Sequence, residues 1–395
     1  PVTARDERTG EISHRYPSFL PDGRHFVYEV QVGGGGSQYK HFVGSLDPKE
    51  TALRLPFESE SNVVYSPPGH LLFVQQGNLR AQPFDVGRLR PVGESFAVAD
   101  LVQVSSIVGF GSFSVSEDGL LAYVGGAAAR FSKLVWTDRA GKEQETLGTA
   151  AVHWDPRLSH DGRRLAVAVE DSRGNSDVWI HDLSRKVSTR FTFDPDADLG
   201  PVWSPDDDRI VFTSYRRGPG DLFQKLSAGA GTEELVLGSP HRKIATDWSP
   251  DGRWLAYHSN MPKTSWNTFM LALPDRKPSV YLDGPFPELA SVFSPDGRWI
   301  AYVSAESGVS EVYVQSFPRG AGKWQISSGG GTMPVWRQDG KELFFLASDG
   351  NLMAVGVKSG STFEAEKPES LFTASVRNFV GLSRRQYDVT ADGQR

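Results

Sequence analysis

A turn sequence that recurs about every 45 residues constrains the fold of this chain more than any other feature. Its clearest copies are Trp203–Asp206, Trp248–Arg253 and Phe293–Arg298, in which an aromatic residue precedes Ser-Pro-Asp. The glycine position of the nine copies falls at residues 23, 69, 119, 162, 207, 252, 297, 340 and 393, with Asp207 replacing glycine. This period is too long for leucine-rich or ankyrin repeats, and it is typical of a propeller blade made of four short strands.

The residues around each turn describe a strand, a tight turn and a second strand. Proline presets φ and Asp-Gly adopts turn conformations, and an apolar run such as Leu255–Tyr257 follows. A third strand comes later in the repeat, such as Thr268–Leu271 or, after the Gly119 turn, Lys133–Trp136. A more polar fourth strand such as Lys323–Ile326 follows it. Apolar residues nowhere recur at helical spacing over three turns. The sequence therefore predicts an all-β propeller of four-stranded antiparallel blades, because a β-sandwich would not repeat a motif in this way.

The number of repeats sets the expected domain organisation. Eight hairpins are followed by a third strand, and a ninth, Val389–Gly393, is cut short. We expect residues 1–395 to form a single propeller domain of about eight blades, truncated at both ends from a longer protein. The alternative is a six- or seven-bladed ring with extra repeats. The glycine-rich pieces Gly33–Gly36 and Ser327–Gly331 are expected in loops between strands.

Composition excludes several classes of protein. The net charge is −6 and the pI about 5.9, which argues against a nucleic-acid partner. No run of 18 apolar residues occurs, so we expect no membrane insertion by this chain. The absence of cysteine excludes disulfides, thiolate catalysis and cysteine-ligated metals.

Catalytic and metal motifs are scarce. The sequence contains neither Gly-x-Ser-x-Gly nor His-Glu-x-x-His, so we expect no catalytic residues and no enzymatic activity in this chain. Asp194, Asp196 and Asp198 alternate as at the opening of a calcium loop, but Pro205 stands where a bidentate Glu is needed. An acidic loop between blades is the favoured interpretation. No cofactor is expected, and calcium remains the one candidate.

Aromatic residues recur at one position of the repeat. Trp203, Trp248, Phe293 and Trp336 stand directly before their turns, and we expect them to pack between blades. Trp266 falls outside that position, in a loop. It is either a core residue, which is the favoured interpretation, or an exposed anchor for a partner.

The repeated turns resemble the WD-like repeats of TolB-type propellers over nearly the whole chain. The segments Tyr65–Val74, Asn78–Asp85, Trp324–Gly331 and Tyr387–Arg395 are similar to the propeller region that follows bacterial membrane serine/threonine kinases. This resemblance implies a sensor or docking module of a signalling protein, in an extracytoplasmic or periplasmic location; a cytoplasmic location stays open. The glycine-rich loop and the His-Arg-Asp loop of kinases are absent, so any kinase activity would belong to a domain outside this chain.

The combined interpretation is a non-catalytic binding and sensing propeller whose loops and central channel face a protein, a peptide or a small ligand. The alternatives are a lactonase-like or glycan-active enzyme with a metal in the channel, the propeller of a peptidase without its hydrolase domain, and a structural spacer. Binding residues are expected in the loops that lead into the innermost strands, where blades converge. These residues are His14, His153, Asp155, Asp198, Arg242, Lys243, Glu288 and Thr332.

Overall fold

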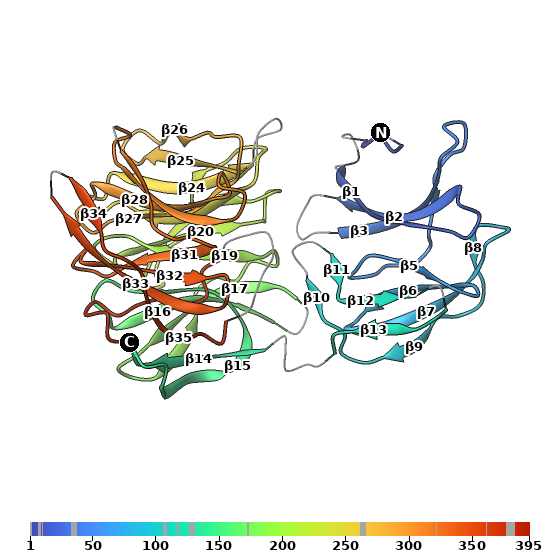
Figure 1. Cartoon of the computed structure of the whole chain (residues 1–395), viewed down its shortest axis with the longest axis horizontal. Helices are drawn as coiled ribbons and strands as arrows, with labels where there is room; N and C mark the ends of the chain where they lie inside the picture. The colour runs from blue at the N-terminus through green and yellow to red at the C-terminus, as the bar shows by residue number, and fades with distance from the viewer. Residues whose placement is uncertain are drawn as a thin grey trace. The chain divides into compact units, whose positions relative to one another are not determined.

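The chain folds into antiparallel β-sheets, as the repeat predicts (Figure 1). The computed structural model describes residues 2–6, 9, 11–32, 38–105, 109–116, 118–125, 131–171, 174–260, 266–320, 322–360, 362–376 and 384–395. These residues contain no α-helix. The prediction of an all-β propeller is therefore confirmed. Gly33–Gly36 and the loop 261–265 before Trp266 lie outside the described residues.

Contacts between residues divide the chain into two compact units, Pro1–Ser132 (unit 1) and Lys133–Arg395 (unit 2). Each unit has its own sheets and its own apolar clusters. The single domain expected for residues 1–395 stays a prediction, and the two units are described separately.

Unit 1 contains two large sheets and two short hairpins. Its main apolar cluster includes Val27, Val43, Leu71 and Phe73, which are 2 % exposed or less. The strands of the large sheets are β1 (Glu11–Phe19), β2 (His25–Val32), β3 (Gln38–Ser45) and β4 (Leu53–Arg54), and β5 (Val64–Ser66), β6 (His70–Gln75), β7 (Asn78–Asp85), β8 (Arg90–Pro91) and β9 (Phe96–Ala99). The hairpins pair β10 (Val104–Ser105) with β11 (Phe110–Gly111) and β12 (Phe113–Val115) with β13 (Leu121–Tyr123).

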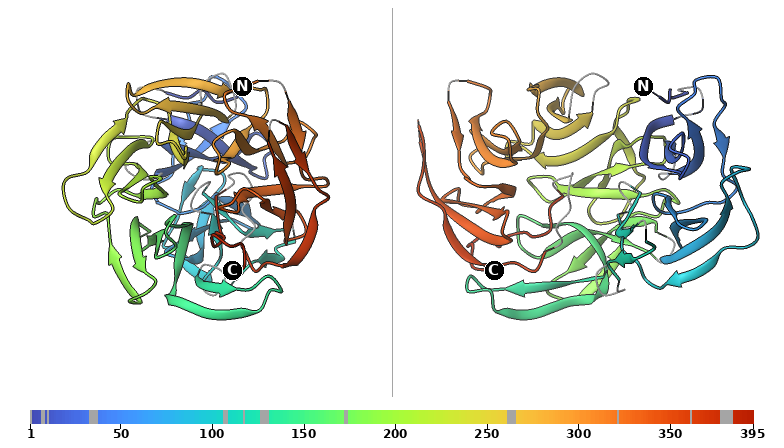
Figure 2. Two further views of the ribbon diagram at one scale, coloured as in Figure 1. Left: turned by 90° about the vertical axis from the view of Figure 1, so that its left-hand side faces the viewer. Right: turned by 45° about the vertical axis from the view of Figure 1, so that its right-hand side comes forward.

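Unit 2 contains five sheets, which Figure 2 (left) shows arranged around an axis. The first three are β14 (Ser132–Thr137), β15 (Glu143–Leu158), β16 (Arg164–Glu170), β17 (Ser176–Asp182) and β18 (Val187–Arg190); β19 (Asp198–Trp203), β20 (Arg209–Ser214), β21 (Asp221–Leu226) and β22 (Glu234–Leu237); and β23 (Lys243–Trp248), β24 (Trp254–Asn260), β25 (Trp266–Ala272) and β26 (Lys277–Leu282). The last two are β27 (Glu288–Phe293), β28 (Trp299–Ser304), β29 (Glu311–Ser316) and β30 (Lys323–Gln325); and β31 (Gly331–Trp336), β32 (Glu342–Ala347), β33 (Asn351–Ser359), β34 (Phe363–Ala365) and β35 (Glu369–Thr373).

The repeated turn is held by side chains that bond to its own backbone. In the turn between β27 and β28, the Ser294 hydroxyl donates to Asp296 and accepts the N–H of Trp299 at 3.0 Å. Asp296 accepts the N–H of Arg298 at 3.1 Å. Gly297 has a φ of 69°, a left-handed conformation that favours glycine. The recurring Asp is thus a turn residue, as its presence in eight of the nine copies suggests.

The aromatic residues before the turns pack differently from blade to blade. Trp203, Phe293 and Trp336 are 3 %, 5 % and 9 % exposed. Trp248, at the same repeat position, is only half-buried. Packing between blades is confirmed for the first three residues and holds only in part for Trp248.

The innermost strands of unit 2 close into a ring with the C-terminal segment Arg384–Arg395. Successive strands β15, β19, β23, β27 and β31 contact one another in turn. The Asp155 N–H donates to the Arg385 carbonyl at 3.2 Å, and the Tyr387 hydroxyl donates to the Met333 carbonyl at 2.8 Å. The C-terminal segment therefore takes the sixth place beside the five sheets. This arrangement corresponds to the alternative of a six-bladed ring accompanied by further repeats.

One strand assignment made from the sequence is wrong. Lys133–Trp136 was expected to follow the Gly119 hairpin as the third strand of its blade. The structure instead pairs β12 with β13 in unit 1, whereas β14 pairs with β15 in unit 2. The reason is the length of β15, whose 16 residues pair with β14 as well as with β16.

Candidate functional site on the axis of unit 2

Bulges in the innermost strands bring backbone groups to the axis of unit 2. Asp155, Gly200, Ala290 and Met333 have φ values of 52°, 62°, 54° and 54°. Each lies at an irregularity in the pairing of an innermost strand with its neighbour. Non-glycine residues in this conformation cost energy and persist where the surrounding structure fixes them. Their recurrence in four strands identifies the axis as a constrained region.

A small cavity lies between these bulges. Its volume is about 50 Å³, and its lining comes from the five innermost strands, from His258 and from the C-terminal segment. The polar side chains around it are Asp155, Arg157, Thr246, His258, Arg384 and Arg385. Such a volume accommodates a water molecule or a group of a few atoms.

Three arginines at the axis pair with three aspartates. Arg157 lies 3.9 Å from Asp247, Arg384 lies 3.4 Å from Asp155, and Arg385 lies 3.1 Å from Asp388. Burial raises the pKa of Asp247 and lowers the pKa of Arg157 to about 10. Because a buried charge without a partner is costly, we expect the loss of either member of such a pair to destabilise the fold.

Two of these aspartates also join neighbouring innermost strands. Asp247 accepts the backbone N–H of Phe293 at 2.7 Å, and Asp388 accepts that of Leu158 at 2.7 Å. Both carboxylates therefore have structural roles in addition to their ion pairs.

Two donors at the cavity lack a partner within the described part of the chain. They are the Nε of Arg384 and the hydroxyl of Thr246, whose residues are 7 % and 6 % exposed. The Arg384 guanidinium also stacks over the Trp154 ring, 5.2 Å from its centroid. Burial lowers the pKa of His258 to about 3, so this ring is neutral. The cavity consequently offers hydrogen-bond donors from a cation and a hydroxyl.

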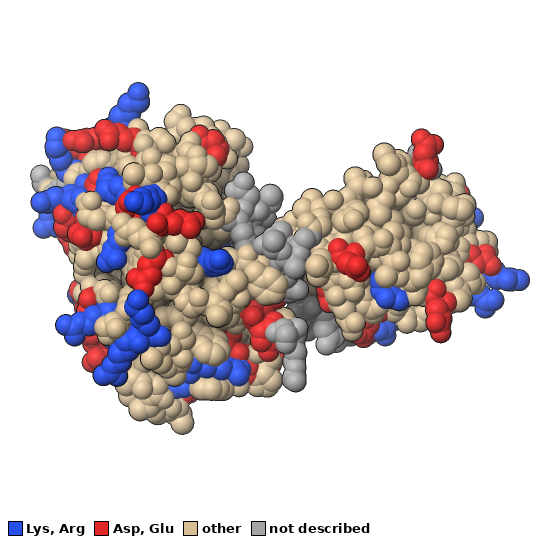
Figure 3. All heavy atoms as spheres, turned by 90° about the horizontal axis from the view of Figure 1, so that it is seen from below, with Lys and Arg blue, Asp and Glu red and all other residues tan. Residues whose placement is uncertain are grey.

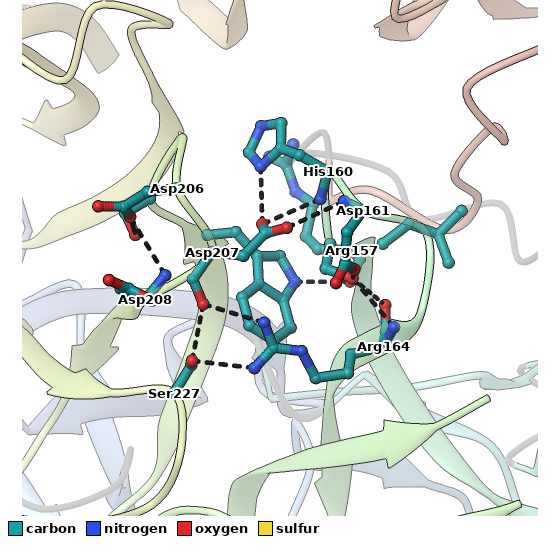
Figure 4. A network of polar contacts seen from close by, with 12 residues as sticks. Arg157, His160, Asp161, Arg164, Asp206, Asp207, Asp208 and Ser227 are labelled. Carbon is teal, nitrogen blue, oxygen red and sulfur yellow. Dashed lines mark hydrogen bonds and ion pairs between the residues drawn. The ribbon is translucent and has the colours of Figure 1, made fainter. Parts of the chain in front are cut away.

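A network of hydrogen bonds, here called the polar clasp, joins the repeated turn that contains His160 to the one that contains Asp207 (Figure 4). The Asp207 carboxylate accepts the N–H groups of His160 and Asp161, each at 2.9 Å, and lies 2.8 Å from the His160 ring. The Asp207 carbonyl accepts bonds from Arg164 and Ser227. Asp207 belongs to the copy of the repeat in which Asp replaces glycine, and His160, in the preceding copy, stands where five other copies have proline.

At two other pairs of consecutive turns in unit 2, the corresponding residues are a proline and a glycine that lie close together. A Cβ added at Gly297 would lie 3.7 Å from Pro250, and one at Gly340 would lie 3.7 Å from Pro295. The pair His160 and Asp207 thus replaces an apolar contact by hydrogen bonds. The paired exchange explains why two consecutive copies each depart from the Ser-Pro-Asp-Gly pattern at one residue, the first at its proline and the second at its glycine.

We expect Asp207→Ala to destabilise unit 2 by about 2–3 kcal/mol, since it removes charge-assisted hydrogen bonds and leaves alanine at a φ of 58°. Urea unfolding followed by tryptophan fluorescence reports on unit 2 alone, because all ten tryptophans lie between residues 136 and 336. Asp208→Ala, at an exposed neighbour, is the control.

The same variant has a pH signature. Hydrogen bonding to Asp207 raises the pKa of His160 above its ordinary 6.5, so the stability that this pair contributes is present below pH 6.5 and is lost as the pH rises through the raised value. Asp207→Ala should flatten the stability profile in that window. Equal profiles for the variant and the parent protein would contradict the clasp.

The predicted binding residues lie in innermost strands or directly before them. His14 lies in β1 of unit 1, His153 and Asp155 in β15, Asp198, Lys243 and Glu288 at the starts of β19, β23 and β27, Arg242 before β23, and Thr332 in β31. Of these, Asp155 lines the axial cavity. Binding by the eight residues stays a prediction.

Several of these side chains pair inside the protein. Asp198 is fully buried 3.3 Å from Arg216, and Lys243, 1 % exposed, lies 3.0 Å from Asp221. Glu288 accepts the N–H of Gly284 at 3.1 Å. Burial raises the pKa of Asp198 to about 6 and that of Glu288 to about 7, and it lowers the pKa of Lys243.

The remaining predicted residues contact neighbouring loops and strands. Arg242 donates to the Tyr215 hydroxyl at 2.5 Å and lies 5.8 Å from the centroid of the half-buried Trp266 ring. The Thr332 hydroxyl donates to the Leu346 carbonyl at 3.4 Å. His14 lies 3.1 Å from Glu11.

Sequence reasoning missed most of the axial charges. Arg157, Asp247 and Asp388 each stand one residue before the aromatic position of their repeat, occupied by Leu158, Trp248 and Val389. Aligning the copies at that position would have found these three residues. Arg384 and Arg385 lie shortly before the ninth turn, in a segment that could be placed only by its contacts.

The candidate calcium ligands face an arginine. Arg216 lies 3.3 Å from Asp194 and 3.3 Å from Asp198, and Asp194 also accepts the N–H of Asp196 at 3.0 Å. Across the described ranges, no group of three or more His, Asp or Glu residues is arranged to hold a metal ion. A search of the same residues found no helix that could cross a membrane.

Charges of both signs lie side by side on the face of unit 2 drawn in Figure 3. The exposed ion pairs of unit 2 include Lys186–Glu145 and Arg276–Glu234. Pairs of this kind add little to stability.

Comparison with known proteins identifies the type of propeller. Residues 102–277 match the family model described as PD40, TolB beta propeller domain. The fold is similar to that of TolB propellers. A TolB structure from Agrobacterium tumefaciens has the same fold, with a TM-score of 0.51 and 18 % identity, over 62 % of this chain and 88 % of that protein.

Relatives with curated descriptions match shorter segments. Identity is 29 % over 103 residues with the uncharacterized peptidase YuxL of Bacillus subtilis, which is 25 % of this chain and 16 % of that protein. It is 30 % over 80 residues with the Tol-Pal system protein TolB of Helicobacter pylori, which is 20 % of this chain and 19 % of that protein. The matched segments therefore span less than a fifth of these relatives.

Proposed function

We propose that this chain is a non-catalytic binding module, and that the axial cavity of unit 2 receives one carboxylate group of a peptide or protein partner. The observation that carries the proposal is that Arg384 lines the cavity and that its buried Nε has no hydrogen-bond partner among the described residues. An unmade hydrogen bond at a buried cation is costly, and a ligand that completes it gains that energy.

The chemistry of the cavity favours a carboxylate. A guanidinium presents N–H groups in a planar fork that matches two carboxylate oxygens, and the Thr246 hydroxyl offers a further donor. The volume of about 50 Å³ holds the carboxylate alone, so the rest of the partner would lie outside the cavity. Asp155, which pairs with Arg384, would limit affinity for free anions and favour a partner with additional contacts.

The proposed setting is extracytoplasmic, as part of a sensor in a bacterial signalling protein. Its support is the TolB type of the propeller together with the sequence segments that resemble kinase-associated repeats. The kinase link depends on those segments alone.

The test uses the full chain with sodium acetate as the probe, compared with sodium chloride at equal ionic strength. Acetate should raise the melting temperature of the transition reported by tryptophan and change the fluorescence of Trp154, which stacks on Arg384. A tetrapeptide that ends in Glu with a free carboxylate should act at lower concentration than its Gln-amide counterpart.

Two variants locate the effect. Thr246→Val removes the hydroxyl without breaking an ion pair and should weaken the acetate effect, whereas Arg384→Gln should abolish it. Arg319→Gln, at an exposed ion pair, is the matched control. An equal response of Arg384→Gln and the parent protein to acetate would overturn the proposal.

The same assay separates this proposal from its rival. An enzyme with a channel metal should gain stability from calcium, manganese or zinc, and the gain should disappear with chelator. That result would favour the enzymatic alternative.

A further inference from the structure

A groove of about 260 Å³ lies in unit 2 between β14 and the C-terminal segment. One wall is β14, of which Lys133, Leu134, Val135, Trp136 and Thr137 all line the groove. The opposite wall is the segment Gln386–Val389. Two adjacent sheets contribute apolar side chains to the remaining sides: Leu158, Leu165, Phe344, Leu352, Leu371 and Phe372.

The strand β14 is more exposed than the third strand of another blade, β29. It is an edge of its sheet, with β15 as its neighbour, and none of its six residues is fully buried. The third strand of another blade, β29, has its first five residues buried between two neighbours. An edge strand with apolar side chains is a template for a further strand.

The turn at Thr390–Arg395 has the same hydrogen bonds as a turn that precedes the second strand of a blade. The Thr390 hydroxyl donates to Asp392 at 2.6 Å and accepts the Arg395 N–H at 3.1 Å. These are the bonds that Ser294 makes with Asp296 and Trp299 in the turn before β28. Arg395 therefore occupies the position of Trp299, the first residue of a second strand.

The position of Arg395 sets where a strand in the groove begins. Arg395 lines the groove, with its guanidinium 4.8 Å from the centroid of the Trp136 ring. In the sheet of β27, the second strand β28 lies between β27 and β29. By analogy, a second strand that started at this position would lie between the C-terminal segment and β14.

We propose that this groove is an acceptor site for one extended apolar β-strand, of the kind that follows the repeated turn in the other blades, and that this strand completes the sheet of β14. Backbone hydrogen bonds to β14 would supply affinity, and apolar side chains packed on Phe344 and Leu158 would supply specificity. The proposal is independent of the axial cavity.

The experiment adds a strand to the full chain directly after Arg395. The added sequence copies Ile300–Ser304, the residues that follow Trp299 in β28. The matched control carries an added segment of equal length in which serine, threonine and asparagine replace the isoleucine, tyrosine and valine. The apolar extension should raise the tryptophan-reported melting temperature about 4 °C or more above the control, and it should shift the emission to shorter wavelength as Trp136 becomes buried.

A groove variant tests the location. Leu134→Asp, made in both extended chains, should remove the difference between the apolar and polar extensions, because the comparison of four proteins cancels the general effect of the substitution. Equal melting temperatures for the two extensions in the parent background would overturn the proposal. So would a dimer of the unextended chain that Leu134→Asp dissociates, because the occupant would then be a second copy.

Discussion

Glu29→Gln is expected to stabilise unit 1 by about 3–5 kcal/mol at pH 8 while leaving its stability near pH 4 almost unchanged. Glu29 lies in β2, is fully buried, and has no hydrogen-bond partner for either carboxylate oxygen within the described residues. Burial raises the pKa of this carboxyl to about 8, although the positive charge of Arg15 on β1 acts to lower it. Glutamine has the same shape and carries no charge at any pH.

The sign follows from proton linkage. A carboxyl whose folded pKa lies above its ordinary 4.5 binds a proton on folding, so stability is fully present below pH 4.5 and is lost as the pH rises to about 8. The glutamine variant should lack this loss. His41, opposite Glu29 on β3, acts in another window, since burial lowers its pKa to about 4 and stability is lost as the pH falls from 6.5.

Hydrogen exchange of β2 and β3 measured by mass spectrometry between pH 5 and 8 is the suitable readout, because unit 1 contains no tryptophan. Protection should fall with pH in the parent protein and stay level in Glu29→Gln, after correction for the intrinsic exchange rate. Glu94→Gln, at an exposed position of the same unit, is the control. Parallel profiles for the parent protein and Glu29→Gln would show that Glu29 is ionised in the folded state.

The repeated turn made most of the fold predictable. Ser294, Asp296 and Gly297 bond within their own turn, so the hairpin is encoded locally and can be recognised from sequence. The partner of β14 could not be predicted in this way. It depends on the pairing of a long strand, β15, and on which repeats close the ring, and neither is a local property.

The candidate site was predictable only in its general position. The sequence predicts Asp198, Lys243 and Glu288 in the loops that lead into innermost strands, and in the structure they are the first residues of β19, β23 and β27. The sequence does not reveal that Arg216 pairs with Asp198, or that Asp221 pairs with Lys243, from neighbouring loops and strands. Such pairs depend on the paths of loops between blades, which differ in length from one blade to the next.

Trp203→Ala is expected to destabilise unit 2 by about 3–5 kcal/mol, as large aromatic truncations in a core do. Trp203 is 3 % exposed and packs with Phe191, Phe212 and Phe223. Its indole N–H donates to the Arg157 carbonyl at 2.9 Å, and the Arg164 guanidinium lies over its ring at 4.6 Å. Alanine would leave a cavity between two sheets and an acceptor without its donor.

Trp248→Ala is the matched control for this loss, because Trp248 holds the same repeat position and is half-buried. Its indole N–H donates to the Gly252 carbonyl, which belongs to the same turn. We expect a cost of about 1–2 kcal/mol, since less apolar surface leaves the core. Urea unfolding of both variants, followed by the remaining tryptophans, measures the difference. Equal losses would show that the repeat position alone sets the packing energy, and that the contacts of Trp203 with the neighbouring sheet add nothing to it.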